Sequence, residues 1–167
     1  LYSVIGGMSF YERKEVKDIL AYLRAARSTR DDVALQRIFN IPARGIGKVS
    51  IERFIDAAAD AGRTLGEHLR CDDALDALRG RAKKGVDQLR EVLETLSSNS
   101  KKSLTDQVQL AIEASGYLPH LEKSEPESWQ ERERNLAELV AAASETEEIL
   151  SSVSSRAAAS GEEFEQI

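Results

Sequence analysis

The sequence predicts an all-α domain built from several helices, and two observations lead to that prediction. The first is composition: among 167 residues only 5% are aromatic and three are proline, whereas alanine, leucine, glutamate and arginine, which favour helices, are plentiful. The second is spacing, because apolar residues recur at the intervals of an amphipathic helix along most of the chain. The length allows one domain with a hydrophobic core of its own.

The first ten residues are the exception to this helical pattern. Residues 1–7 are predicted to form a short strand that ends in a turn at Gly6 and Gly7. Because a single strand leaves its backbone groups without a ladder partner, it either pairs with something outside this chain or frays. The chain enters directly on this apolar run, so we expect it to be a piece of something longer.

Two helices and a break are expected next. The first covers residues 11–27, where apolar residues share one face, and we expect Ser9 to cap it with Glu12 completing a capping box. The second covers residues 31–39 and begins at one of two aspartates. Pro42 then interrupts the helical pattern.

The rest of the chain is expected to be helical except for its loops and its end. Helices are predicted over residues 49–61, 64–70, 72–78, 82–96, 104–115 and 129–152. Thr64 is expected to cap the second of these, and Gly116 to end the fifth. Residues 123–128 are predicted to be a loop, and residues 153–167 a flexible tail rich in serine, alanine and glutamate. The main helical domain therefore spans residues 11–122, and a return helix follows the loop.

Charge excludes some classes of protein and leaves others open. The chain holds 23 Lys and Arg against 29 Asp and Glu, a net charge of −6, which taken whole argues against nucleic-acid binding. The acidity is concentrated, however: residues 103–167 hold 4 basic and 14 acidic side chains, whereas residues 1–70 hold 12 and 9. One cysteine rules out an internal disulfide, and no apolar run reaches the length of a membrane span.

Catalytic and metal-binding patterns are absent from the sequence. Gly47 and Lys48 resemble the end of a nucleotide-binding phosphate loop, but Val49 stands where that loop needs Ser or Thr. His68 and His120 have no partner at the spacing of metal ligands, and we expect the first to be exposed on a helix and the second to lie in a loop. We therefore expect no metal, no cofactor and no catalysis in this chain alone.

The most informative segment is residues 39–54, in which a Gly-Ile-Gly turn joins two helices and resembles a helix-hairpin-helix motif. The two glycines allow a turn with positive φ, and the isoleucine between them can anchor the turn in the core. The free N–H groups at the start of the next helix favour an anion, and flanking cations favour a DNA phosphate held without reading the bases. The candidate DNA-backbone residues are Arg44, Gly45, Ile46, Gly47, Lys48, Ser50 and Arg53. The alternative is an ordinary tight turn whose glycines serve geometry alone.

A second basic segment precedes the long helix predicted over residues 82–96. Residues 78–86 combine two glycines with four cations: Arg79, Arg81, Lys83 and Lys84. The sequence leaves two interpretations open, a second phosphate contact and a solvated basic face at the start of a helix.

Residues 2–24 resemble a segment of the UvrD/PcrA/Rep-type superfamily 1 DNA helicases, with a Gly-Gly turn, an aromatic pair, Glu-Arg, and then Glu-Val-Lys-Asp at the start of a helix. The Gly-Ile-Gly segment follows at the distance found in that family, where it belongs to the accessory domain usually called 2B. Residues 132–139 resemble the family's helix that returns toward the motor. One departure is Tyr11, where many relatives carry phenylalanine, and the motor motif that follows in the family is missing.

The resemblance implies an accessory domain of an ATP-dependent helicase that travels 3′→5′ along DNA. ATP and Mg²⁺ would act at the parent's motor domains, which are not in this chain. Residues 1–10 would be a stub of the second motor domain, and the junction with it would include Gly6, Gly7, Phe10, Arg13, Lys17 and Asp18. Arg13 and Lys17 would contact DNA or the neighbouring domain, or would instead pair with carboxylates on their own helix.

The implied partners are the phosphate backbone of duplex DNA, the motor domains of the same parent chain and repair proteins, with no membrane. The implied location is the bacterial cytoplasm, in association with the nucleoid. The alternative function is a protein-interaction or autoinhibitory module with little DNA binding of its own, which the acidic last third of the chain favours.

Overall fold

The computed structural model describes residues 7–162, and all its regular elements within that range are helical, which confirms the all-α prediction. None of the helices in this range is long and apolar enough to cross a membrane. The elements are α1 (Gly7–Tyr11), α2 (Lys14–Arg27), α3 (Asp32–Ile38), α4 (Lys48–Asp60), α5 (Leu65–Leu69), the 3₁₀ turn η1 (Asp72–Leu75), α6 (Gly80–Ser98), α7 (Leu104–Ala114), α8 (Tyr117–Ser124) and α9 (Trp129–Glu162).

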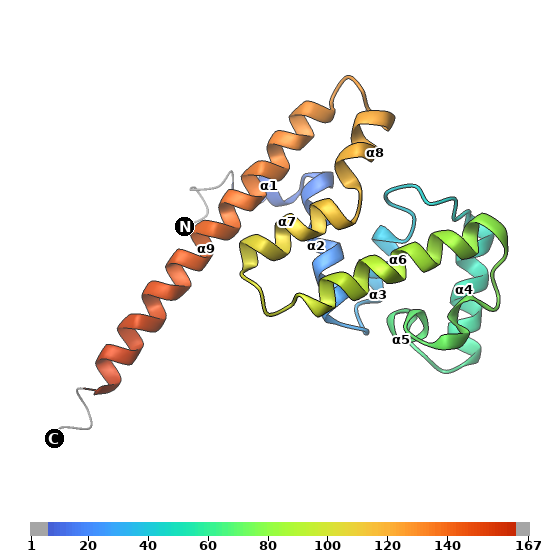
Figure 1. Ribbon diagram of the computed structural model, residues 1–167, viewed down its shortest axis with the longest axis horizontal. Coiled ribbons are helices and arrows are strands. Elements are labelled where there is room, and N and C mark those ends of the chain that lie inside the picture. Colours follow the sequence, from blue (N-terminus) through green and yellow to red (C-terminus); the bar gives the residue numbers. More distant parts are fainter. Residues whose placement is uncertain (1–6, 163–167) are drawn as a thin grey trace.

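The helices form an elongated molecule with α2 at its centre (Figure 1). α2 packs against α3, α6, α7 and α9, and its buried face includes Val16, Ile19 and Tyr22, each with no exposed surface. α6 runs from the end of the molecule that α4 and α5 form back toward this centre. α9 lies at the opposite end and extends well beyond the other helices. The fold therefore has two distinct poles joined by α2 and α6.

Several helix boundaries follow from local signals that the sequence carries. The Asp31 carboxylate accepts a hydrogen bond from the Ala34 N–H at 3.0 Å and caps α3. Thr64 and Glu67 form a reciprocal capping box at α5, which confirms the cap predicted at Thr64. Gly116 adopts the left-handed conformation, with a φ of 69°, directly after α7, as the sequence predicts.

The chain ends differ from the sequence prediction. The strand predicted over residues 1–7 lies, up to residue 6, outside the described residues, and Gly7 opens helix α1. Ser9 lies within α1, and α2 begins at Lys14 without a side-chain cap, so the predicted capping box is wrong. The last helix continues to Glu162, ten residues beyond its predicted end, because alanine and glutamate favour helices and no proline interrupts them.

Three further assignments between α5 and α9 are wrong. The helix predicted over residues 72–78 is a single 3₁₀ turn, Asp72–Leu75. His120, expected in a loop, lies in α8. His68, expected to be exposed, is only 2% exposed.

His68 is buried by tertiary packing against α4. Its ring centroid lies 5.0 Å from that of Phe54, and its Nε2 atom has no hydrogen-bond partner among the described residues. Its Nδ1 atom lies 3.4 Å from the Arg63 guanidinium. Burial lowers the pKa of His68 below its ordinary value of 6.5; Asp73 opposes this shift and Arg63 adds to it.

We expect His68 to make the fold less stable in mild acid. Below about pH 6.5 the unfolded chain protonates this side chain while the buried ring resists protonation, so the free energy of unfolding falls as the pH drops toward the folded pKa. Urea unfolding at about pH 7.5 and about pH 5.5 tests this expectation. Between these two pH values the wild type should lose more stability than the His68→Gln variant, because the variant has no imidazole to titrate at this position. Equal losses in both proteins would contradict the assignment.

Candidate nucleic-acid interface

Of the segment predicted at residues 39–54, residues 39–47 form the hairpin loop between α3 and α4, and the rest is the start of α4. One side chain closes the loop. The Asn40 carbonyl oxygen Oδ1 accepts hydrogen bonds from the backbone N–H groups of Arg44 at 2.7 Å and Ile46 at 3.2 Å. Ile46 is 1% exposed, so it fixes the turn to the core. Gly45 has a φ of 73°, which residues with a Cβ rarely adopt. The hydrogen bonds to Asn40 and the burial of Ile46 therefore both hold the turn in place.

The Arg44 side chain points into the hairpin. Its guanidinium donates to the carbonyl oxygens of Ile38 at 3.1 Å and Pro42 at 3.3 Å, and also to the Tyr22 hydroxyl. Tyr22 donates in turn to the Ile41 carbonyl at 2.5 Å. Burial raises the pKa of Tyr22 above its ordinary value, although the nearby Arg44 acts against this rise, so the hydroxyl keeps its proton. The donors of Arg44 thus shape the loop and join it to α2.

The second basic segment lies directly beside the hairpin. A Cβ at Gly85 of α6 would lie 2.3 Å from the Arg44 carbonyl oxygen and 2.8 Å from Cγ1 of Ile46. A Cβ at Gly45 would lie 3.2 Å from Cβ of Arg81. The two segments that the sequence indicates separately therefore form one surface. Gly85 lies in the second predicted segment but is not among its candidate contact residues. The signal for its role is a glycine inside a helix, which costs helix stability and marks a close approach.

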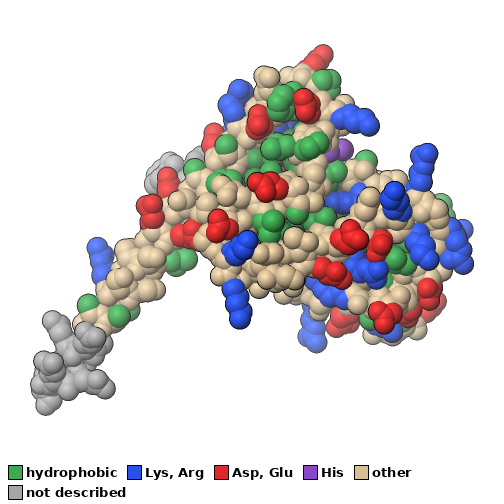
Figure 2. Space-filling model, in the orientation of Figure 1, with side chains coloured by type: hydrophobic (Ala, Val, Ile, Leu, Met, Phe, Trp, Pro, Cys, Tyr) green, Lys and Arg blue, Asp and Glu red, His purple; other side chains and the backbone are tan. Residues whose placement is uncertain are grey.

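Exposed cations surround this contact on both sides. Figure 2 shows many Lys and Arg side chains at this end of the molecule, with Asp and Glu side chains among them. Ser50 is half-buried at the start of α4. Nζ of Lys48 lies 4.0 Å from the Glu52 carboxylate. Because an exposed ion pair of this kind contributes little to stability, the charge of Lys48 stays available to a ligand. Six predicted cations are exposed here: Lys48, Arg53, Arg79, Arg81, Lys83 and Lys84.

Two helix N-termini border the same contact. α4 begins at Lys48 and α6 begins at Gly80, and neither helix has an acidic residue in its first turn. Neither N-cap residue, Gly47 or Arg79, caps its helix with a side chain. The partial positive charge of both helix ends adds to that of the surrounding cations. This surface therefore favours an anionic ligand with several charges.

The three charged residues of the predicted motor junction are all paired within this chain, Arg13 with Asn135 and Glu138 of α9. Nζ of Lys17 lies 2.7 Å from Glu12, which is the surface pairing that the sequence leaves open. Asp18 is completely buried and accepts hydrogen bonds from Nε of Arg37 at 2.8 Å and from the Tyr117 hydroxyl at 2.5 Å. Asp18 therefore ties α2 to α3 and α8.

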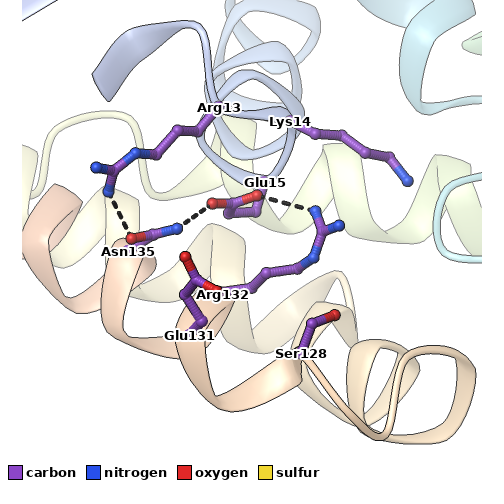
Figure 3. Close-up of a pocket in the computed structure, with 7 residues that line it drawn as sticks. All are labelled: Arg13, Lys14, Glu15, Ser128, Glu131, Arg132 and Asn135. Atoms are coloured by element: carbon purple, nitrogen blue, oxygen red, sulfur yellow. Dashed lines mark hydrogen bonds and ion pairs between the residues drawn. The ribbon is translucent and has the colours of Figure 1, made fainter. Parts of the chain in front are cut away.

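Glu15 joins α2 to α9, as Figure 3 shows. Its carboxylate is 3% exposed and accepts hydrogen bonds from Arg132 at 3.1 Å and from Asn135 at 2.5 Å. Arg13 donates to the Asn135 side chain at 2.5 Å and lies over the buried ring of Phe10, 5.4 Å from its centroid. Two of the three segments that carry the family resemblance, residues 2–24 and 132–139, thus contact each other. The sequence gives no local signal for this pairing, because about 120 residues separate its partners.

These observations define a class of protein: an all-α domain with a basic surface at one pole, assembled from a hairpin and a glycine-containing helix start. No three His, Cys, Asp or Glu side chains within residues 7–162 come together as a metal site would require.

The chain belongs to the UvrD-like helicase C-terminal domain family, whose sequence profile matches residues 1–159. It is 31% identical over 140 residues to the ATP-dependent DNA helicase PcrA of Bacillus subtilis, covering 83% of this chain and 19% of that protein. It is 35% identical over 144 residues to DNA helicase II of Escherichia coli, covering 84% of this chain and 20% of that protein. It is 36% identical over 146 residues to the ATP-dependent DNA helicase UvrD1 of Mycobacterium tuberculosis, covering 86% of this chain and 19% of that protein. The chain thus spans about a fifth of the length of the curated relatives it matches.

Proposed function

We propose that this chain is the accessory 2B domain of an ATP-dependent DNA helicase that travels 3′→5′. Its role is to hold the backbone of the duplex without reading the bases and thereby to regulate unwinding. ATP and Mg²⁺ act at the motor domains of the parent, which are also its first protein partners, and repair proteins are further partners. Membership of the UvrD-like family and the names of the relatives, which are DNA helicases, support this proposal.

The observation that carries the proposal is the close contact between the hairpin and the start of α6. It places Arg81 beside Gly45 and the start of α6 against the hairpin, and these two segments together carry two helix N-termini and six exposed cations. Successive phosphates of a duplex present several charges to such a surface, whereas bases lie deeper in the grooves. The binding is therefore expected to be independent of base sequence and strongly dependent on salt. Arg44 contributes by shaping the hairpin, since its donors are engaged inside it.

Fluorescence anisotropy with labelled short duplexes over a range of salt concentrations tests this function. Removing two cations with Lys48→Gln and Arg81→Gln should reduce the slope of log affinity against log salt by about 2, because each lost phosphate contact contributes about 0.9. Lys101→Gln with Lys102→Gln is the matched control, since both lysines are exposed on the loop between α6 and α7. If the two double variants behave alike, the surface is assigned wrongly.

A protein-interaction module is the second candidate function. It is favoured by the large apolar side chains that α9 exposes, Ile149, Leu150 and Val153. Absence of duplex binding by the wild type, even at low salt, would favour this function over the first.

A further inference from the structure

Asn40 uses only half of its side-chain amide to hold the hairpin loop. Its Oδ1 atom accepts hydrogen bonds from the N–H groups of Arg44 and Ile46. Its Nδ2 atom, which carries two donor hydrogens, has no hydrogen-bond partner among the described residues. The fold therefore leaves both donors of this amide unused.

The hydrogen bonds of the loop fix the orientation of this amide. If it were turned over by half a rotation, its NH2 group would face the two backbone N–H groups, donor against donor, and both backbone hydrogens would lose their acceptor. Oδ1 is therefore the atom that faces the backbone of the turn, and Nδ2 is directed away from these two N–H groups.

Nδ2 is also accessible from outside the protein. Within residues 7–162, Nε2 of His68 is the one buried side-chain nitrogen or oxygen atom that lacks a partner. Nδ2 of Asn40 lacks a partner too, so this atom is not buried, although the residue as a whole is half-buried. Because the loop already holds this donor in place, the cost of ordering it when a ligand binds is small.

Backbone donors of the same loop are unused as well. The N–H groups of Gly45 and Gly47, on either side of Ile46, have no partner in the part of the chain that the structure describes. Both glycines are exposed, so no side chain covers these groups. Asparagine side chains and backbone N–H groups are among the usual donors to the phosphate oxygens of DNA. One short loop therefore presents neutral donors of both kinds.

We propose that Asn40 contacts the duplex directly, by donating from Nδ2 to an oxygen of the phosphate that the hairpin holds. This inference rests on the proposed function and adds a contact residue to it. Asn40 is absent from the DNA-backbone residues that the sequence predicts, because it is uncharged and precedes the Gly-Ile-Gly turn. A single amide then shapes the turn through Oδ1 and binds the ligand through Nδ2.

Asn40→Asp separates the two roles of this side chain. Its carboxylate oxygens can still accept from Arg44 and Ile46, so the thermal midpoint should stay close to that of the wild type. The variant replaces the Nδ2 donor with a negatively charged acceptor. Its affinity for a short labelled duplex should therefore fall by at least about tenfold, as expected when a charged group loses a hydrogen bond.

Gln88→Glu is the matched control for the added charge. Gln88 is exposed on α6, one turn beyond Gly85. At about 0.15 M salt, where exposed charges are strongly screened, this variant should change the affinity by about twofold at most. If Gln88→Glu and Asn40→Asp weaken binding equally, the loss reflects net charge and the inference is wrong.

NMR of the wild-type side-chain amide gives a readout that a merely structural asparagine would not change. The NH2 signals of Asn40, assigned through bonds from its own backbone amide, should shift when the duplex is added. Those of Asn99, whose Nδ2 already donates to the Thr95 carbonyl oxygen, should not. Unchanged Asn40 NH2 signals beside shifted backbone signals of the loop would overturn the inference and leave the proposed function standing. Absence of duplex binding by the wild type would refute the proposed function and this inference with it.

Discussion

Replacing Asp18 with alanine is expected to lower the free energy of unfolding by about 3–5 kcal/mol, the usual cost of removing one partner of a buried charge pair. The Asp18 carboxylate has no exposed surface and holds Arg37 and Tyr117 from two different helices. Burial raises the pKa of the Tyr117 hydroxyl, and the neighbouring Asp18 raises it further, so the hydroxyl remains a donor at any ordinary pH. Without Asp18, this donor is left buried and unsatisfied.

Lys17 is the control for this prediction, because it precedes Asp18 in the chain and pairs with the exposed Glu12. Lys17→Gln is expected to change the free energy of unfolding by less than about 0.5 kcal/mol, as is usual for exposed ion pairs. Urea unfolding monitored by circular dichroism measures both variants. Similar losses in the two would show that Asp18 is not the interior anchor that its contacts indicate.

Replacing Gly85 with alanine is expected to cost about 2–3 kcal/mol and to move the hairpin away from α6. The new methyl group would lie 2.3 Å from a backbone oxygen of Arg44, which cannot yield as the end of a flexible side chain can. Because the substitution separates Arg81 from the turn, duplex affinity should fall together with stability.

Gly47→Ala is the matched control for this variant. A Cβ at Gly47 meets nothing within 4 Å, and its φ of −78° suits any residue. Its stability should therefore stay close to that of the wild type, as measured by thermal unfolding. A loss of stability at Gly47 equal to that at Gly85 would mean that the tight turn, and not the contact with α6, sets the stability.

The sequence predicts the elements whose signals are local. α2 and α6 follow from apolar spacing, and the caps at Asp31 and Thr64 follow from side chains that bond within their own first turn. The end of α9 is missed because its Ser- and Ala-rich segment lacks an apolar stripe dense enough to distinguish a helix from a mobile tail.

Features that depend on distant partners are not predictable from one sequence. The burial of His68 is decided by its contact with Phe54 on another helix. Both basic segments are recognisable from glycines and cations, but their union at Gly45 and Arg81 is a tertiary contact without a local signal. Arg44 shows the same limit, since its charge suggests a ligand contact while the fold uses it to hold the hairpin.

The bonding of α2 has a mechanical consequence. Tyr22 fastens the hairpin to this helix through Arg44, and Glu15, seven residues earlier, fastens α9 to it through Arg132 and Asn135. Seven residues of α-helix are about 10 Å of stiff rod. A torque applied to the hairpin therefore passes to α9 along two turns of helix, with no flexible loop in between to absorb it.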